Sequence, residues 1–440
     1  MSKVFKFLFG RELEEDDPFL SAKDKSKLIN RKNTGAYVCQ SGNLPTDAKP
    51  HSLVCAPSGG GKTSAYIIPS LLSAKPDRSF TVFDPGGDVY EKTAGYLVER
   101  GFQVKVLDID DQENSERFNP LARVKDEMSI QKLADILVDA NQEGNKGDVF
   151  WNESAKSLVK LMLFALLNTK QTTRPKTLNA LYELLIMYGT EQQELDEFMV
   201  MNLPEKRQME YMSFMESQSE KVQQSILSVC KTALSKVTTL ETLTSDETLN
   251  FESLRLVPTV LFVKVREDQI HYFSFVVSIF FTQLFEFLMI GAKPGQTYLG
   301  VTILADEYTA YSVKNVDLLI SVLRRRKVYL AIILQSISQL EATGKHQSDT
   351  IISNCSTLFV FPGVGDSTAS RIEQMLGTYE KDGKQVKVMT ARQIRMMKKN
   401  EVLFIHSNYP PKVIKMKPWF EVRKFKKRVN LPILKKGGRT

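Results

Sequence analysis

The chain has 440 residues, of which 42% are hydrophobic and 25% are charged. This composition is typical of a folded globular protein and excludes a disordered or collagen-like chain. The formal net charge is +8, but residues 412–440 alone hold eleven Lys or Arg and one acid, Glu421, so the rest of the chain is close to neutral. The overall charge therefore does not identify the folded body as a nucleic-acid-binding surface.

The N-terminus begins with a short apolar stretch, Val4–Phe9, which Lys6 interrupts. It is too short for a signal peptide or a membrane-spanning helix. We expect it to pack on the protein body, with contact to a membrane surface as the alternative. The four cysteines and four histidines are scattered. We therefore expect neither a disulfide framework nor a metal cluster, and a reducing cytoplasm is the natural setting.

Seven apolar runs bounded by turn signals predict β-strands. Most of them are rich in Val, Ile and Phe and lack alternation, which is typical of strands buried on both faces of a parallel sheet. Helical patterns separate several of the runs, so we expect an α/β fold built from βαβ units. The runs are Ser52–Ala56, Phe80–Phe83, Gln103–Leu107, Thr259–Val265, Gly300–Leu304, Val328–Leu334 and Thr357–Phe361.

The strongest motif is the glycine-rich run Ala56–Thr63, which follows the first of these strands and precedes a helical pattern over Ser64–Leu72. It fits the Walker A phosphate loop of P-loop NTPases, with Ala in place of the first Gly. Glycines allow backbone N–H groups to face a phosphate, the lysine reaches the β- and γ-phosphates, and the next hydroxyl ligates Mg²⁺. The predicted ATP-binding residues are Pro57, Ser58, Gly59, Gly60, Gly61, Lys62, Thr63 and Ser64, with Thr63 also predicted to bind Mg²⁺.

The predicted strand Phe80–Phe83 is followed directly by an acid, Asp84, in the sequence DPGGD. In a parallel sheet such an acid lies beside the nucleotide crevice, where it could contact the metal shell or the bound water. A simple turn explains the same residues equally well. We leave both interpretations open.

Residues 128–255 differ from their surroundings. They carry long patterns with a 3.6-residue period, such as Ile130–Val138 and Ala155–Leu167, and contain no strong strand signal. We therefore predict an all-α insertion within the α/β domain. The apolar stretch Phe273–Ile290 has the length of a membrane span, but Gln283 and Glu286 lie within it, so we expect a buried core helix and a soluble chain.

An apolar strand also precedes two adjacent acids, Asp306 and Glu307. We predict that Asp306 completes the Mg²⁺ shell and that Glu307 orients and deprotonates the attacking water. Acids often mark a strand-to-helix turn, and it is the combination with the phosphate loop that favours the catalytic interpretation.

The strand Val328–Leu334 ends at Gln335, which we interpret as a γ-phosphate sensor or a strand-end cap. Before this strand lie Arg324, Arg325, Arg326 and Lys327. Arg324 or Arg326 could act on the ATP of a neighbouring subunit, and a solvated basic turn or a DNA contact are the alternatives. The predicted catalytic residues are Lys62, Glu307, Gln335, Arg324 and Arg326.

The chain resembles the conjugative type IV coupling proteins, the TraG/TraD-type ATPases. The resemblance spans roughly Pro50 to Phe420 and is most specific in ILQSISQLE and in the late segment VLFIHSNYPPKVIKMKPWF. The other motifs that carry it are APSGGGKT, VFDPGGDVYEKTAGY, RFNPL, DVFWNESA, ILADEY, LRRRKVYLA, NCSTLFVFPG and MTARQIRMM.

The resemblance implies a RecA-like motor domain with an inserted all-α domain and a hexamer around a DNA path. It also implies ATP hydrolysis coupled to movement of single-stranded DNA, with its attached relaxase, towards type IV secretion channel proteins. The chain departs from the family at Gly86, where members usually have a Lys, and it shows none of the usual N-terminal membrane-spanning helices. We therefore expect a cytoplasmic protein that a separate anchor protein recruits to the inner face of the membrane.

Two alternative functions stay open. They are a recruitment scaffold or ATP switch for relaxosome and channel proteins, and another DNA translocase or secretion ATPase. The basic tail could bind DNA, bind acidic lipid or a partner, or be solvated. These predictions divide the chain into five parts. The parts are an N-terminal segment (1–50), the first part of the nucleotide-binding domain (51–127), the all-α domain (128–255), the second part of the nucleotide-binding domain (256–420) and the basic tail (421–440).

Overall fold

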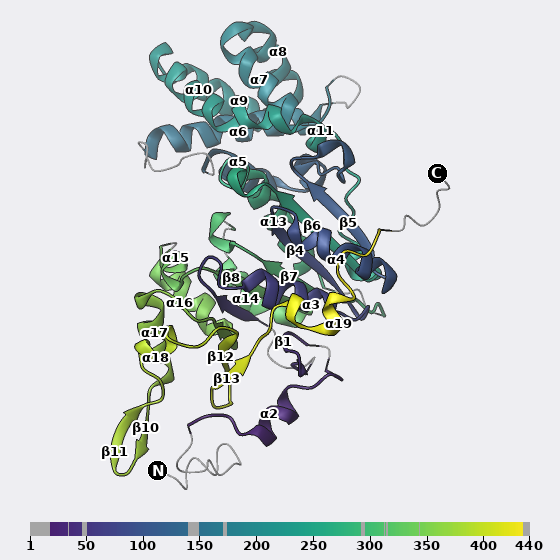
Figure 1. The fold of residues 1–440 in the computed structure, drawn as a ribbon. Helices are drawn as coiled ribbons and strands as arrows, with labels where there is room; N and C mark the ends of the chain where they lie inside the picture. The colour runs from purple at the N-terminus through teal and green to yellow at the C-terminus, as the bar shows by residue number, and fades with distance from the viewer. Residues whose placement is uncertain are drawn as a thin grey trace.

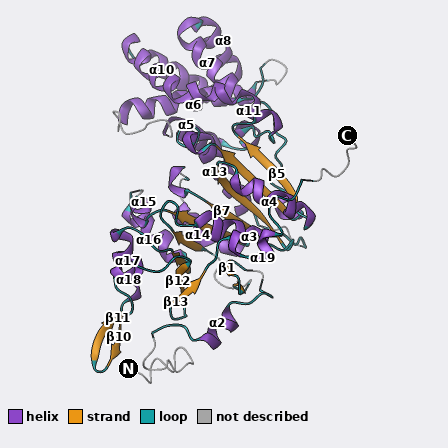
Figure 2. Cartoon of the chain, viewed as in Figure 1, coloured by secondary structure: helices purple, strands orange, loops and turns teal. Residues whose placement is uncertain are grey.

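The computed structural model describes residues 18–33, 35–45, 51–139, 149–169, 174–291, 295–311, 313, 316–342 and 344–433. A large twisted sheet forms its centre, with helices on both faces and a separate layer of helices at one end (Figures 1 and 2). The N-terminal residues Val4–Phe9 and the tail residues Lys435, Lys436 and Arg439 lie outside the described residues.

The central sheet has nine strands in the order β13-β12-β9-β3-β8-β7-β4-β6-β5. The seven strands from β9 to β5 are parallel to their neighbours, and β12 pairs antiparallel with both β9 and β13. The sheet strands are β3 (Ser52–Cys55), β4 (Arg78–Pro85), β5 (Gln103–Asp108), β6 (Thr259–Val265), β7 (Gly300–Ala305), β8 (Val328–Leu334), β9 (Thr357–Val360), β12 (Glu401–His406) and β13 (Lys412–Lys415).

All seven strands expected from the apolar runs are present and parallel, so the predicted α/β fold is confirmed. Alternate side chains of the buried strands enter two different cores, as Leu53 and Val54 show in β3. Of the seven parallel strands, the edge strand β5 is the least buried. Burial on both faces explains why these runs are continuously apolar.

Two groups of helices cover the two faces. One face is covered by η1 (Lys62–Ile67), α3 (Ile68–Leu72), α4 (Asp88–Glu99) and the N- and C-terminal segments. The other face is covered by α13 (Ser274–Met289), α14 (Val316–Leu323), α15 (Ile337–Glu341), α16 (Lys345–Asn354) and α17 (Asp366–Leu376).

Helix α13 is the apolar stretch that has the length of a membrane span, and it is a buried core helix as predicted. Gln283 and Glu286 each contact another part of the protein. Gln283 donates to the carbonyl of Pro120 at 2.9 Å, and Glu286 pairs with Lys132 at 2.5 Å.

The chain between β5 and β6 forms the predicted layer of helices, and its described residues contain no strand. The limits predicted for this domain remain a prediction. Its helices are α5 (Glu127–Asp139), α6 (Val149–Asn168), α7 (Leu178–Thr190), α8 (Gln192–Asn202), α9 (Glu205–Glu216), α10 (Glu220–Leu234), η4 (Ser235–Leu240), α11 (Glu241–Thr244) and α12 (Ser253–Leu256).

Part of the basic tail packs on the body. In α19 (Arg423–Lys426) the Phe425 ring is fully buried and lies 6.4 Å from the ring of Tyr37 in β1 (Tyr37–Cys39). Arg428 donates to the carbonyl of Leu72 at 2.5 Å. Phe425 is therefore a core residue and is not available for contact with a nucleic acid or lipid.

Two strand pairs lie outside the central sheet. The first, β1 with β2 (Gly42–Asn43), packs near the N-terminal helix α2 (Ala22–Leu28). The second is the hairpin of β10 (Thr378–Lys381) and β11 (Lys384–Lys387), which projects from the body beyond α17 and α18 (Ala391–Arg395) (Figure 1).

Candidate active site

The phosphate loop connects the carboxyl end of β3 to η1. It is fixed to the sheet because Ala56 donates its N–H to the carbonyl of Leu334 in β8, at 3.0 Å. Gly59 and Gly61 have φ angles of +70° and +94°, which favour glycine. A side chain on Gly60 would lie 2.8 Å from the Pro57 carbonyl oxygen. The three glycines are therefore required by the shape of the loop.

The helix that follows begins at Lys62, two residues earlier than the pattern predicted. Gly61 accepts a hydrogen bond from the Ala65 N–H at 2.7 Å, so the helix starts immediately after the loop. Thr63 and Ser64 lie in its first turn, where the partial positive charge of the helix N-terminus attracts anions. This arrangement matches the predicted phosphate-binding role of the loop.

The Lys62 ammonium lies between the two predicted acids at the end of β7. Lys62 Nζ is 3.2 Å from Asp306 Oδ1 and also pairs with Glu307 Oε1. Asp306 is only 5% exposed, whereas the Glu307 side chain is 22% exposed. The lysine and the acids are more than 240 positions apart along the chain. They meet because β3 and β7 lie on either side of β8 and end at the same edge of the sheet.

Gln335, at the end of β8, completes this cluster. Its side-chain N–H group donates to Glu307 Oε1 at 3.1 Å and Oε2 at 3.4 Å. Glu307 itself has a left-handed backbone conformation, with φ +44°, and its N–H donates to Asp306 Oδ1 at 3.0 Å. This uncommon conformation turns the two adjacent carboxylates towards the same lysine.

Burial and charge shift the pKa values of this cluster. Burial alone would lower the pKa of Lys62, but Asp306 and Glu307 outweigh it and the pKa is raised. Burial raises the pKa of Asp306, and the neighbouring Lys62 reduces this effect only in part. The carboxylate of Asp306 thus lies in a poorly solvated site that a cation stabilises.

The donor set fits Mg²⁺. A hydroxyl (Thr63) and a buried carboxylate (Asp306) are oxygen ligands of the kind that Mg²⁺ prefers beside phosphates. The glycine cradle, which a Cβ at position 60 would fill, provides the surface for those phosphates.

The Asp84 carboxylate caps α4. Its two oxygens accept from the N–H groups of Val89 at 3.1 Å and Tyr90 at 2.7 Å. Burial raises the pKa of Asp84 to about 7, although these two hydrogen bonds and Lys264 lower it. Gly86 and Gly87 have φ angles of +80° and +79°, as a turn requires. The geometry favours the turn interpretation over a metal contact.

The basic residues Arg324 and Arg326 lie elsewhere. They form the short helix η7 (Arg324–Arg326), are exposed, and precede the amino end of β8. The phosphate loop lies beyond the carboxyl end of the neighbouring parallel strand β3. The seven residues of β8 separate the two edges by roughly 23 Å. These arginines do not reach the phosphate loop of their own chain, and a role on a neighbour's nucleotide remains a prediction.

Two hydroxyl residues next to the cluster were not predicted. Ser336, which follows Gln335, bonds through Oγ to Thr368 Oγ1 of α17 at 3.0 Å, and Thr368 also accepts from the Ile337 N–H at 3.1 Å. Thr368 is fully buried. Serine and threonine are common at helix starts, so the sequence held no signal for this long-range contact.

Comparisons with known proteins identify the family of the chain. The family model described as "Type IV secretory system Conjugative DNA transfer" matches residues 15–388. The chain belongs to this family. Its members include coupling proteins of conjugative DNA transfer, which confirms the resemblance found in the motifs.

A curated relative is protein VirD4 of Rhizobium radiobacter, which is 23% identical over 351 residues and 76% of this chain. The chain spans about half the length of this relative (49%).

Two solved structures of the plasmid coupling protein TrwB share the fold. The unbound form has a TM-score of 0.72 at 17% identity and covers 93% of this chain and 94% of that chain. The form in complex with ADP and Mg²⁺ has a TM-score of 0.72 at 16% identity, and the match covers 91% of this chain and 92% of that chain. These matches support the predicted RecA-like class with a helical domain.

Among the described residues of this family member, no helix is both long enough and apolar enough to span a bilayer.

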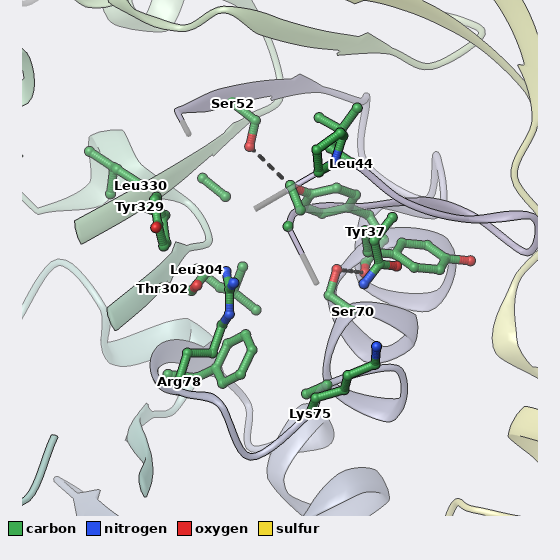
Figure 3. A pocket seen from close by; sticks show the side chains of 18 residues that line it. Tyr37, Leu44, Ser52, Ser70, Lys75, Arg78, Thr302, Leu304, Tyr329 and Leu330 are labelled. Carbon is green, nitrogen blue, oxygen red and sulfur yellow. Dashed lines mark hydrogen bonds between the residues drawn. The ribbon is translucent and has the colours of Figure 1, made fainter. Parts of the chain in front are cut away.

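A separate cavity lies near the amino ends of the parallel strands, whereas the phosphate loop lies at their carboxyl ends (Figure 3). Arg78, Thr302 and Tyr329, from the amino ends of three strands, line one side of it. Ser70 of α3 lines the other side. The residues that line this cavity include none of the predicted site residues, so it is distinct from the phosphate loop.

Proposed function

We propose that this chain is a coupling ATPase that binds ATP and Mg²⁺ and uses ATP hydrolysis to drive single-stranded DNA, with its attached relaxase, to a type IV secretion channel. The position of Lys62 carries the proposal, because its ammonium contacts both Asp306 and Glu307. A phosphate-binding lysine, a metal ligand and a general base are thus within reach of one phosphoryl group.

In this proposal Lys62 exchanges the two acids for the β- and γ-phosphates when ATP enters. Its charge then stabilises the negative charge that develops on the transferred phosphoryl group. Glu307 accepts a proton from the attacking water. Gln335, which donates to both Glu307 oxygens, holds this carboxylate in place and senses the γ-phosphate.

Thr63 and Asp306 would hold Mg²⁺, which neutralises charge on the phosphate oxygens when it is bound. The complex of TrwB with ADP and Mg²⁺ supports the choice of nucleotide and metal ion. Ser58, Gly59 and Gly61 contribute backbone N–H groups. Pro57, which has no N–H, shapes the loop with Gly60, whose N–H donates to the Pro57 carbonyl at 2.8 Å. Ser64 belongs to the helix start that faces the anion.

We also propose that subunits assemble around the DNA, as a hexamer, so that Arg324 or Arg326 of one subunit acts on the nucleotide of the next. Both arginines are exposed, as such a contact requires. Channel proteins and a membrane anchor protein are the further proposed partners, with the protein recruited to the inner face of the membrane.

The test is ATPase activity measured against protein concentration, with and without single-stranded DNA. A hydrolysis rate per subunit that rises steeply with concentration, and rises further with DNA, supports an assembled DNA motor. A slow rate that is independent of both supports the alternative, a recruitment scaffold that uses ATP as a switch.

A further inference from the structure

The hairpin of β10 and β11 has two chemically different faces. Its turn, Asp382–Gly383, has two positive φ angles of +51° and +72°, which suit a tight hairpin. The register pairs Lys381 with Lys384 and Tyr379 with Val386, so these four side chains share one face.

The lysine face carries no compensating acid. Lys381 and Lys384 are exposed, and no described Asp or Glu forms an ion pair with either of them. Two like charges directly opposite each other destabilise a hairpin. An isolated two-stranded hairpin is itself only marginally stable. The arrangement therefore weakens the fold locally, and an anionic partner would offset this cost.

The other face holds the hairpin to the protein. Lys387 pairs with Glu373 of α17, and Thr378 donates to Gln385 at 2.8 Å across the same face. Because side chains alternate between faces, the face with Tyr379, Lys381 and Lys384 points away from this anchor.

We propose that this outward face of the hairpin binds single-stranded DNA, an inference that rests on the proposed function. Two adjacent lysines can each contact a backbone phosphate. The partly exposed Tyr379 ring, two residues before Lys381, offers a surface on which an unpaired base can stack. Duplex DNA has no unpaired base to use this ring, so a single strand fits the face better.

A series of contacts along α17 joins this hairpin to the nucleotide cluster. Ser336, next to Gln335, bonds to Thr368 in the first turn of α17. Helix α17 has 11 residues and is therefore about 16 Å long, and it ends at Leu376, two residues before β10. Glu373 in its last turn also accepts from the Ala391 N–H at 2.5 Å, which fixes the base of the hairpin. We infer that movement of Gln335 is transmitted through Thr368 and α17 to the DNA.

The first test measures the affinity of the full-length chain for a fluorescent oligo-dT strand at several salt concentrations. Neutralising both lysines (K381Q/K384Q) removes two phosphate contacts. The negative slope of log K against log salt therefore becomes less steep by about 1.4, and the affinity at 0.1 M salt falls about 25-fold. Tyr379→Ala weakens binding roughly 5- to 150-fold and leaves the salt slope unchanged.

The matched control is K206Q/K221Q, which removes two exposed lysines from the helical layer and leaves both affinity and slope unchanged. Thermal unfolding of each variant checks that the fold is retained. Thr368→Val leaves the DNA affinity unchanged but reduces the ratio of ATPase rates with and without DNA at least threefold, and Thr368→Ser, which keeps the hydroxyl, restores that ratio.

The outcomes separate this inference from the proposed function. If the wild-type strand affinity and the DNA stimulation are intact and K381Q/K384Q matches the wild type in affinity and slope, the hairpin assignment is wrong and the proposed function stands. If the lysine variant instead loses binding to duplex DNA or to phosphatidylserine vesicles and keeps binding to the strand, the single-strand assignment is overturned. If the wild-type chain neither binds the strand nor responds to it, the proposed function and this inference both fail.

Discussion

The side chain of Gln335 donates to both carboxylate oxygens of Glu307, at 3.1 Å and 3.4 Å. The two residues follow neighbouring parallel strands, β8 and β7, which end at the same edge of the sheet. Through this contact a residue at the end of one strand fixes the orientation of a carboxylate at the end of the next. Glu307 is in turn bound by Lys62 of the phosphate loop.

We predict that Lys62→Ala and Glu307→Gln both abolish ATP hydrolysis but differ in nucleotide binding. In the proposed mechanism Glu307 acts in the chemical step, so its substitution lowers kcat by about 10²- to 10⁴-fold while ATP affinity is retained. The same mechanism assigns to Lys62 a contact with the phosphates of bound ATP, so its loss weakens affinity as well. Single-turnover rates and equilibrium nucleotide binding measure the two effects. An equal loss of affinity in both variants would contradict these roles.

Substitutions of Gln335 test its contact with Glu307. Gln335→Ala removes the donor that orients the carboxylate, and we expect kcat to fall at least tenfold with little change in ATP affinity. Gln335→Glu replaces the N–H donor with a second carboxyl group beside Glu307, so we expect at least the same loss of kcat as in the alanine variant. An unchanged kcat in both variants would show that Gln335 only caps the strand.

The shape of the phosphate loop predicts a loss of binding in Gly60→Ala. The added Cβ would lie 2.8 Å from the Pro57 carbonyl oxygen and 2.9 Å from Pro57 Cδ. We expect ATP affinity to fall roughly 5- to 150-fold, as overpacking by a methyl group predicts. Gly365→Ala is the matched control, because a Cβ at Gly365 would have no neighbour within 4 Å and its φ is −61°. Equal affinities of the two variants would argue against a tight phosphate cradle.

His51 predicts a pH dependence of stability. Burial lowers the pKa of His51 to about 4, and its Nδ1 accepts from the Leu330 N–H at 3.1 Å. The unfolded chain titrates near ~6.5, so between these two values it binds a proton that the folded chain does not. Acidification from pH 6.5 to 4 therefore removes up to ~3 kcal/mol of unfolding free energy through this residue.

The His51→Asn variant isolates this effect, because an amide oxygen can replace the Nδ1 acceptor and does not titrate. Urea unfolding at a series of pH values should show a flatter acid limb in the variant. The Asp84 carboxyl has the opposite effect: because its pKa is raised to about 7, it lowers the unfolding free energy as the pH rises through the same range. This contribution is the same in both proteins and cancels in the difference. Identical pH dependences would show that His51 takes up protons equally in the folded and the unfolded chain, which would contradict the lowered pKa.

Much of the fold follows from patterns in the sequence. The seven parallel strands were recognisable because burial on both faces demands uninterrupted apolar residues, as in Val328–Leu334. The antiparallel strands β12 and β13 were not predicted, and β13 is short and largely not buried, so its pattern is weak. The hairpin β10–β11 is largely exposed, so burial imposes no apolar pattern on it, and only its Asp-Gly turn offered a signal.

The candidate site was predictable only in part. Glycine spacing and strand-end acids identified the residues of the phosphate loop and the acid pair, because the chemistry of phosphate binding restricts these residue types. The left-handed backbone of Glu307, which turns its carboxylate towards Lys62, and the bond between Ser336 and Thr368 of α17 both involve segments that are distant along the chain. Such contacts between distant segments leave no periodicity or spacing in the sequence. The packing of Phe425 in the core was missed for the same reason, since its basic neighbours suggested a solvated tail.

Calorimetric titration of magnesium ATP into the Glu307→Gln chain tests the central claim most directly, because this variant is expected to hold the nucleotide without consuming it. We predict one binding site per chain, dependent on Mg²⁺ and lost when Lys62→Ala is added. Absence of binding heat under conditions where the chain is folded, or equal binding with and without Lys62, would contradict the claim that the glycine loop and the paired acids form a nucleotide site.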